Sequence, residues 1–215
     1  MTTRDADPYP AYASAREVGD VVWDEGMRAW LVLGHEACAF VETREDLFAE
    51  PTGSLPGADR ITGPHEFRSL TGEPHHVLHH YLARRWLPRE IEPYRDRFVR
   101  PIVAGRLDAL RSAGLAELWT DVAAVVPIAI VGRVIGLPPM DDAALRRAKG
   151  FTDAVLAWRH SYGDDPAKVE AAVAASEALE ADIRPIVRAR RRDPTDDLIS
   201  GLWEVGPTVV PGWGE

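Results

Sequence analysis

Hydrophobic and polar positions follow two different periods along the chain. Two short apolar runs, Val21-Val-Trp23 and Ala29-Trp-Leu-Val-Leu33, are separated by the turn signal Asp24-Glu-Gly26. Two β-prone runs joined by a turn that contains glycine predict a β-hairpin, here over 18–34. On either side of it, apolar residues at helical spacing predict short helices over 11–17 and 35–44.

The segment 50–73 is dense in proline and glycine, which predicts a long irregular loop, and such loops are usually functional. After residue 73 the pattern becomes almost wholly helical. Breaks that contain glycine or proline divide it into predicted helices over 74–85, 89–111, 118–136, 141–160, 166–192 and 195–204. The predicted fold is therefore mainly α with a small β-sheet: a hairpin over 18–34, a loop over 50–73 and a helical body over 74–204.

Composition narrows the function classes. The 215 residues contain 25 basic and 34 acidic side chains, for a net charge of −9, which argues against a nucleic-acid-binding protein. Cys38 is the only cysteine, which excludes an intrachain disulfide and a zinc site made of thiolates. No signal-peptide pattern opens the sequence, and its longest apolar-rich stretch, 122–131, is interrupted by Pro127 and too short to span a bilayer. We expect a cytoplasmic protein without membrane association.

The segment with the strongest chemical signal opens the helical body. Four of the seven histidines fall within six residues, three arginines follow, and no acidic residue separates them: His75, His76, His79, His80, Arg84, Arg85 and Arg89. Helical spacing pairs the histidines at i,i+4, which suits a zinc site, but no third ligand is identified by its spacing. The other interpretations are an anion clamp of imidazoles and guanidiniums, and a solvated basic face. Spacing alone does not decide between these two.

The same segment carries a family resemblance. Gly72-Glu-Pro-His-His-Val-Leu-His-His-Tyr-Leu-Ala-Arg-Arg-Trp-Leu-Pro-Arg89 resembles the C-helix segment of bacterial cytochrome P-450 proteins, which typically reads Gly/Asp-x-x-His-x-x-x-Arg followed by an aromatic residue, a proline and a basic residue. Four further segments resemble the family in the right order: Asp7-Pro-Tyr-Pro-Ala-Tyr12, Trp30-Leu-Val-Leu-Gly-His-Glu36, 121–138 and Arg190-Arg-Arg-Asp-Pro-Thr-Asp-Asp-Leu-Ile-Ser-Gly-Leu202.

The resemblance implies the N-terminal half of a cytochrome P-450-like domain, helices A to H, that ends before the family's central I helix. It implies haem b as cofactor, with the propionates bound by His75 and His79. His79 stands where the family has arginine, and Trp86 stands where it usually has phenylalanine. The cysteine loop that ligates the iron is expected from the missing C-terminal half, so no metal ligand is assigned in this chain and Cys38 is expected to be a small core residue.

The resemblance also implies partners. His80, Arg84, Arg85 and Arg89 would form the docking face for an acidic ferredoxin-type electron donor. A small-molecule substrate would contact Phe67, Leu70, Phe151, Val155 and Leu156, for which ordinary loop or core packing is the alternative. The implied function is a haem-thiolate monooxygenase that oxidises a small organic substrate with O2. The alternative is a haem-less helper protein of the same fold that stabilises a partner enzyme.

Overall fold

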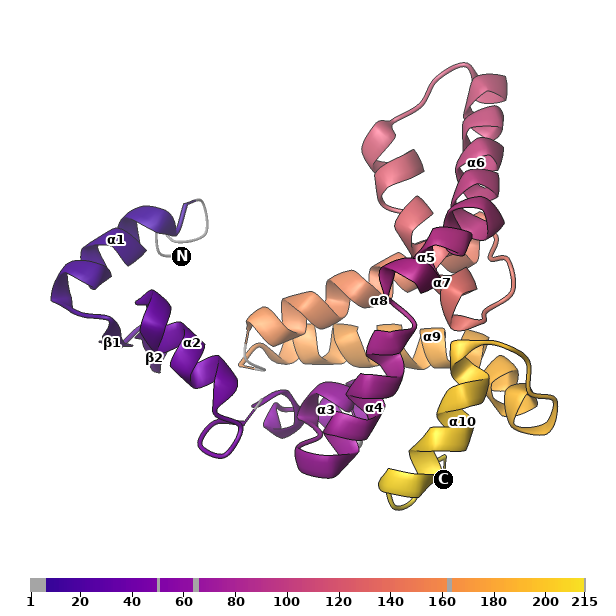
Figure 1. The fold of residues 1–215 in the computed structure, drawn as a ribbon. Helices are drawn as coiled ribbons and strands as arrows, with labels where there is room; N and C mark the ends of the chain where they lie inside the picture. The colour runs from indigo at the N-terminus through magenta and orange to yellow at the C-terminus, as the bar shows by residue number, and fades with distance from the viewer. Residues whose placement is uncertain (1–6, 50, 64–65, 162–163, 215) are drawn as a thin grey trace. The chain divides into compact units, whose positions relative to one another are not determined.

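The computed structural model describes residues 7–49, 51–63, 66–161 and 164–214 (Figure 1). They belong to two compact units, 1–50 and 51–215. Of the loop predicted over 50–73, residues 50, 64 and 65 lie outside the described residues. Among the described residues, no helix combines the length and apolar character needed to cross a bilayer.

The first unit is built around the predicted hairpin. Its elements are α1 (Tyr9–Val18), β1 (Val21–Asp24), β2 (Ala29–Val32) and α2 (His35–Thr43). The strands are antiparallel, and Trp23 pairs with Trp30, their ring centroids 5.4 Å apart in an edge-on arrangement. The Asp24 carboxylate accepts a hydrogen bond from the Met27 amide (2.8 Å) and closes the turn. The prediction of a hairpin in 18–34 is confirmed.

The second unit is helical. Its elements in chain order are η2 (Pro51–Ser54), α3 (Ala58–Ile61), η3 (Phe67–Ser69), α4 (Gly72–Arg84), α5 (Pro88–Tyr94), η4 (Arg95–Val99), α6 (Arg100–Ala113), η5 (Trp119–Ala123), α7 (Val126–Ile135), α8 (Asp142–His160), α9 (Pro166–Arg192) and α10 (Leu198–Val209). The mainly helical fold with one two-stranded sheet is as predicted. The expectation that 50–73 is irregular throughout is wrong, because η2, α3 and η3 are short helical turns within it.

Two of the predicted helices contain π turns, at η4 and η5. Proline explains both positions, because a proline nitrogen cannot donate to the carbonyl four residues earlier. Pro101 removes one such bond at the junction of η4 and α6, and Pro127 removes one at the start of α7. The helix predicted over 89–111 is therefore continuous but locally underwound, and the one predicted over 118–136 is divided.

The core of this unit lies where α8 and α9 run side by side and contact α3 (Figure 1). Trp158 is fully buried there, and its indole N–H donates to the Pro56 carbonyl at 2.8 Å. The Ser176 hydroxyl of α9 donates to the Ile61 carbonyl at 2.6 Å. Gly57 precedes α3 with a φ of +83°, and a Cβ there would meet Val169 at 2.7 Å, so only glycine fits. The segment 55–61 is thus fixed against the α8–α9 pair.

Candidate functional site

Helix α4 carries the histidines, and packing on one face fixes its position. It begins at Gly72, whose φ of +65° lies in the left-handed region, and Pro74 occupies the first turn. Leu78 is buried on the inner face. Tyr81 contacts α10, where a Cβ at Gly201 would overlap its ring, and its hydroxyl donates to the Leu198 carbonyl at 3.5 Å. These contacts hold α4 through Leu78 and Tyr81, while His79 and His80 are exposed.

The two histidines predicted to bind propionates lie next to each other. The ring centroids of His75 and His79 are 5.7 Å apart. Phe67 from η3 completes the group, with its ring 5.2 Å from that of His75 and stacked at 8° and 6.4 Å on that of His79. A protonated imidazole offers two N–H donors, so the pair presents donors that suit carboxylates. We call these three side chains the histidine cluster.

A buried ion pair holds the turn that carries Phe67. Glu66, which precedes it, pairs with Arg159 of α8, and the two side chains are only 13% and 20% exposed. Breaking such a pair is strongly destabilising because the remaining charge stays buried. The sequence offers no local signal for this contact, because its partners come from a loop and a distant helix. It positions η3 against the core and therefore beside α4.

The zinc interpretation finds no support in the geometry. Within the described part of the chain, no group of three or more histidine, cysteine, aspartate or glutamate side chains is arranged to hold a metal ion. Cys38 is half-buried in α2, and its thiol donates to the Val32 carbonyl at 3.3 Å. It lies beside the hairpin of the first unit but is not among the buried core residues, which differs from the expectation.

Some of the residues predicted to face an electron donor form ion pairs with carboxylates and others do not. These residues are His80, Arg84, Arg85 and Arg89. His80 and Arg84 are exposed and make no ion pair with any described residue. Arg85 lies 3.3 Å from Asp196 and over the Tyr81 ring, and Arg89 lies 3.2 Å from Glu90. Carboxylates therefore reduce the positive charge of half of this group.

The structure separates the residues predicted to line a substrate pocket, which are Phe67, Leu70, Phe151, Val155 and Leu156. Phe67 belongs to the histidine cluster, and Leu70 is half-buried close by in sequence. Val155 is buried in the core formed by α3, α8 and α9, and Phe151 packs against it. Leu156 is exposed. The structure thus brings only Phe67 to the histidines and places Phe151 and Val155 within the packing of α8.

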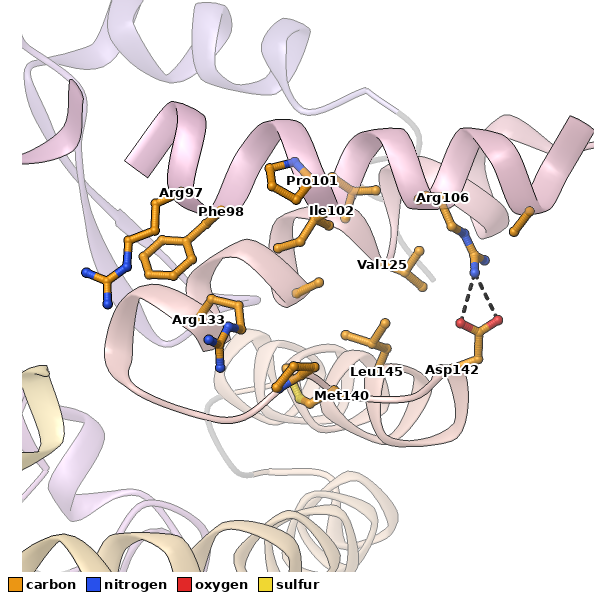
Figure 2. A pocket seen from close by; sticks show the side chains of 15 residues that line it. Arg97, Phe98, Pro101, Ile102, Arg106, Val125, Arg133, Met140, Asp142 and Leu145 are labelled. Carbon is orange, nitrogen blue, oxygen red and sulfur yellow. Dashed lines mark hydrogen bonds and ion pairs between the residues drawn. The ribbon is translucent and has the colours of Figure 1, made fainter. Parts of the chain in front are cut away.

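Sequence reasoning identified no pocket between α6, α7 and α8, yet one of about 470 Å³ lies there (Figure 2). Phe98, Ile102, Val125 and Leu145 contribute apolar walls. At one end the Arg106 guanidinium binds both oxygens of Asp142 at 2.9 Å (Figure 2). The apolar positions had a helical period, but periodicity does not distinguish a packed face from an open one.

Comparison with known proteins decides the family. No family model matches the chain. Among curated proteins, it is 30% identical over 204 residues to the cytochrome P-450 monooxygenase PikC of Streptomyces venezuelae, covering 92% of this chain and 46% of that protein. It is 29% identical over 210 residues to nocardicin C N-oxygenase of Nocardia uniformis subsp. tsuyamanensis, covering 91% and 49%. The chain belongs to the bacterial cytochrome P-450 family.

Solved structures give the same fold. The epothilone B-bound cytochrome P-450 epoK superposes with a TM-score of 0.73 at 19% identity, over 96% of this chain and 53% of that one. A myxobacterial cytochrome P-450 in complex with myristic acid gives 0.67 at 26% identity, over 93% and 51%. The chain spans about half the length of the cytochromes P-450 that it matches, so its fold is the corresponding part of theirs.

Proposed function

We propose that this chain provides the propionate-binding part of a haem-thiolate monooxygenase that oxidises a small organic substrate with O2 and electrons from a redox partner. The observation that carries the proposal is the histidine cluster, which presents two imidazoles on one face of the helix whose sequence resembles the family's C helix. Haem bound to a cysteine thiolate supplies the O–O cleavage chemistry of this family.

The residues present fit the haem's carboxylates. His75 and His79 would each donate an N–H to a propionate, and a nearby carboxylate favours the charged imidazole that donates most strongly. Phe67 lies against both rings and restricts their rotation. Arginine at position 79 would extend further and offer more donors, so the clamp formed by two histidines should be the weaker version.

The thiolate ligand would come from outside these 215 residues. Cys38 lies in the first unit and its thiol is hydrogen-bonded to the hairpin backbone. The 215-residue chain mixed with haem should therefore show no thiolate band in its reduced carbon monoxide difference spectrum. Such a band would contradict the proposal.

The decisive experiment uses the whole haem protein and measures haem transfer to apomyoglobin. His75→Ala removes one charge-assisted hydrogen bond, worth roughly 1.5–3 kcal/mol, and should raise the haem loss rate about tenfold or more. His79→Arg restores the family residue and should slow the loss.

His80→Ala is the matched control, because this exposed histidine of the same helix lies outside the histidine cluster. Equal loss rates for His75→Ala and His80→Ala would refute the clamp. A whole protein that takes up no haem would favour the alternative, a haem-less helper.

We further propose that an acidic ferredoxin-type donor docks on His80, Arg84, Arg85 and Arg89. The support is electrostatic: this basic group lies on a chain of net charge −9. Complementary charge raises the association rate of a transient encounter more than its affinity. Because Asp196 and Glu90 partly neutralise Arg85 and Arg89, Arg84 should carry most of the effect.

A further inference from the structure

A second pocket, of about 390 Å³, lies where α5, η4, α7 and the start of α10 meet. Its charged lining consists of three carboxylates and four arginines, the latter being Arg85, Arg97, Arg133 and Arg190. We call it the arginine pocket. It shares Arg97, Phe98 and Arg133 with the pocket between α6, α7 and α8, and Figure 2 shows these three side chains together at one end of that pocket.

Each of the three carboxylates that line the arginine pocket is already paired with an arginine other than Arg97 or Arg133. Asp197 pairs with Arg190 at 2.6 Å, and Asp196 pairs with Arg85 at 3.3 Å. The third, Glu90, binds the neighbouring Arg89 at 3.2 Å. Among the described residues, no carboxylate lies within ion-pair distance of Arg97 or Arg133.

The two unpaired guanidiniums lie against the same aromatic ring. The Cζ atom of Arg97 is 4.9 Å from the centroid of Phe98, and that of Arg133 is 5.6 Å away. Arg133 is also fixed by a hydrogen bond from its Nη1 to the Leu137 carbonyl at 2.6 Å. Both guanidiniums thus line the pocket without a carboxylate to neutralise them, and an anion that enters the pocket would supply the missing counter-charge.

We propose that the arginine pocket binds the phosphate ester of a small organic molecule. A phosphate monoester carries a charge of about −1.5 to −2 near neutral pH and so matches two guanidiniums, whereas a carboxylate neutralises only one. The volume exceeds what a phosphate needs, and Tyr94, Phe98 and Trp86 supply aromatic surface for the organic part. Tyr94 and Phe98 already form a ring pair at 5.7 Å.

The test is calorimetric titration of the whole haem protein with phenyl phosphate, inorganic phosphate and benzoate. Phenyl phosphate should bind most tightly, benzoate at least tenfold more weakly, and inorganic phosphate also more weakly. Benzoate binding as tightly as phenyl phosphate would overturn the choice of phosphate. Equal affinity for phenyl phosphate and inorganic phosphate would refute the claim that the pocket binds the organic part of the molecule.

Variants locate the site. Arg97→Gln removes an exposed side chain, so the fold should survive, and it should weaken phenyl phosphate binding at least tenfold. Arg133→Lys keeps the charge but loses the planar fork and should also weaken it. Arg100→Gln is the matched control, because Arg100 lies outside the pocket and pairs with Asp96 at 2.6 Å. If Arg97→Gln and Arg100→Gln weaken binding equally, or neither does, the phosphate is not bound by this pocket.

Discussion

Replacing Asp197 with asparagine should destabilise the second unit by about 2 kcal/mol. Its carboxylate caps α10 by accepting from the Ser200 amide at 2.7 Å, and it also accepts from Arg190 Nε and from the Thr195 hydroxyl, both at 2.6 Å. Burial raises the pKa of Asp197, but these hydrogen bonds outweigh it and lower the pKa from 3.8 to about 2. Each pKa unit corresponds to about 1.4 kcal/mol of preference for the charged form in the folded chain.

Asparagine keeps the shape and one acceptor oxygen but removes the charge, so the loss should approach that value. Urea unfolding monitored by tryptophan fluorescence measures it near neutral pH. Asp196→Asn is the matched control: its side chain is 90% exposed and its ion pair with Arg85 should contribute at most about 1 kcal/mol.

The pH dependence supplies a second check. Because the folded pKa of Asp197 is depressed, its contribution is present above about 3.8 and is lost as the pH falls toward about 2. The difference between wild type and Asp197→Asn should therefore shrink over that interval. Equal losses in Asp196→Asn and Asp197→Asn, or a difference that stays constant with pH, would refute the reasoning.

The remaining predictions concern packing and docking. Gly201→Ala should destabilise the chain by roughly 1–3 kcal/mol because its methyl group overlaps the Tyr81 ring, whereas Gly150→Ala, in open space within α8, should stabilise it by about 0.5–1 kcal/mol. Urea unfolding would contradict this if both changes had the same sign. In the whole haem protein, Arg84→Glu/Arg85→Glu should slow haem reduction by an acidic ferredoxin-type donor and flatten its dependence on salt. Stopped-flow rates and salt slopes equal to wild type would leave the basic group as ordinary surface.

Helices with strong end signals could be predicted from the sequence. The predicted range 166–192 coincides with α9, because Asp165 caps its first turn, Pro166 opens it and Pro194 follows its end. The predicted start of the last helix, residue 195, lies three residues before the observed start of α10 at Leu198. Its true cap, Asp197, is one of two adjacent aspartates, and only its hydrogen bond with Ser200 distinguishes it. Local propensity does not contain that information.

The candidate site could likewise be predicted from the sequence only in part. The proximity of His75 and His79 follows from their i,i+4 spacing once α4 is a helix, so it could be predicted. The Phe67 contact could not, because its position depends on the Glu66–Arg159 ion pair between a loop and α8.

The arginines that lack an acidic partner could not be predicted either. A sequence shows which side chains are basic but not which of them already have an acidic partner. Seven residues around α4 looked like one basic group, yet Arg85 and Arg89 are paired there. Two arginines that no motif singled out, Arg97 and Arg133, remain without a carboxylate among the described residues and face one ring. An arginine can attract an anion only to the extent that its charge is not already neutralised. A small free anion is therefore better sought at Arg97 and Arg133 than at the paired Arg85 and Arg89.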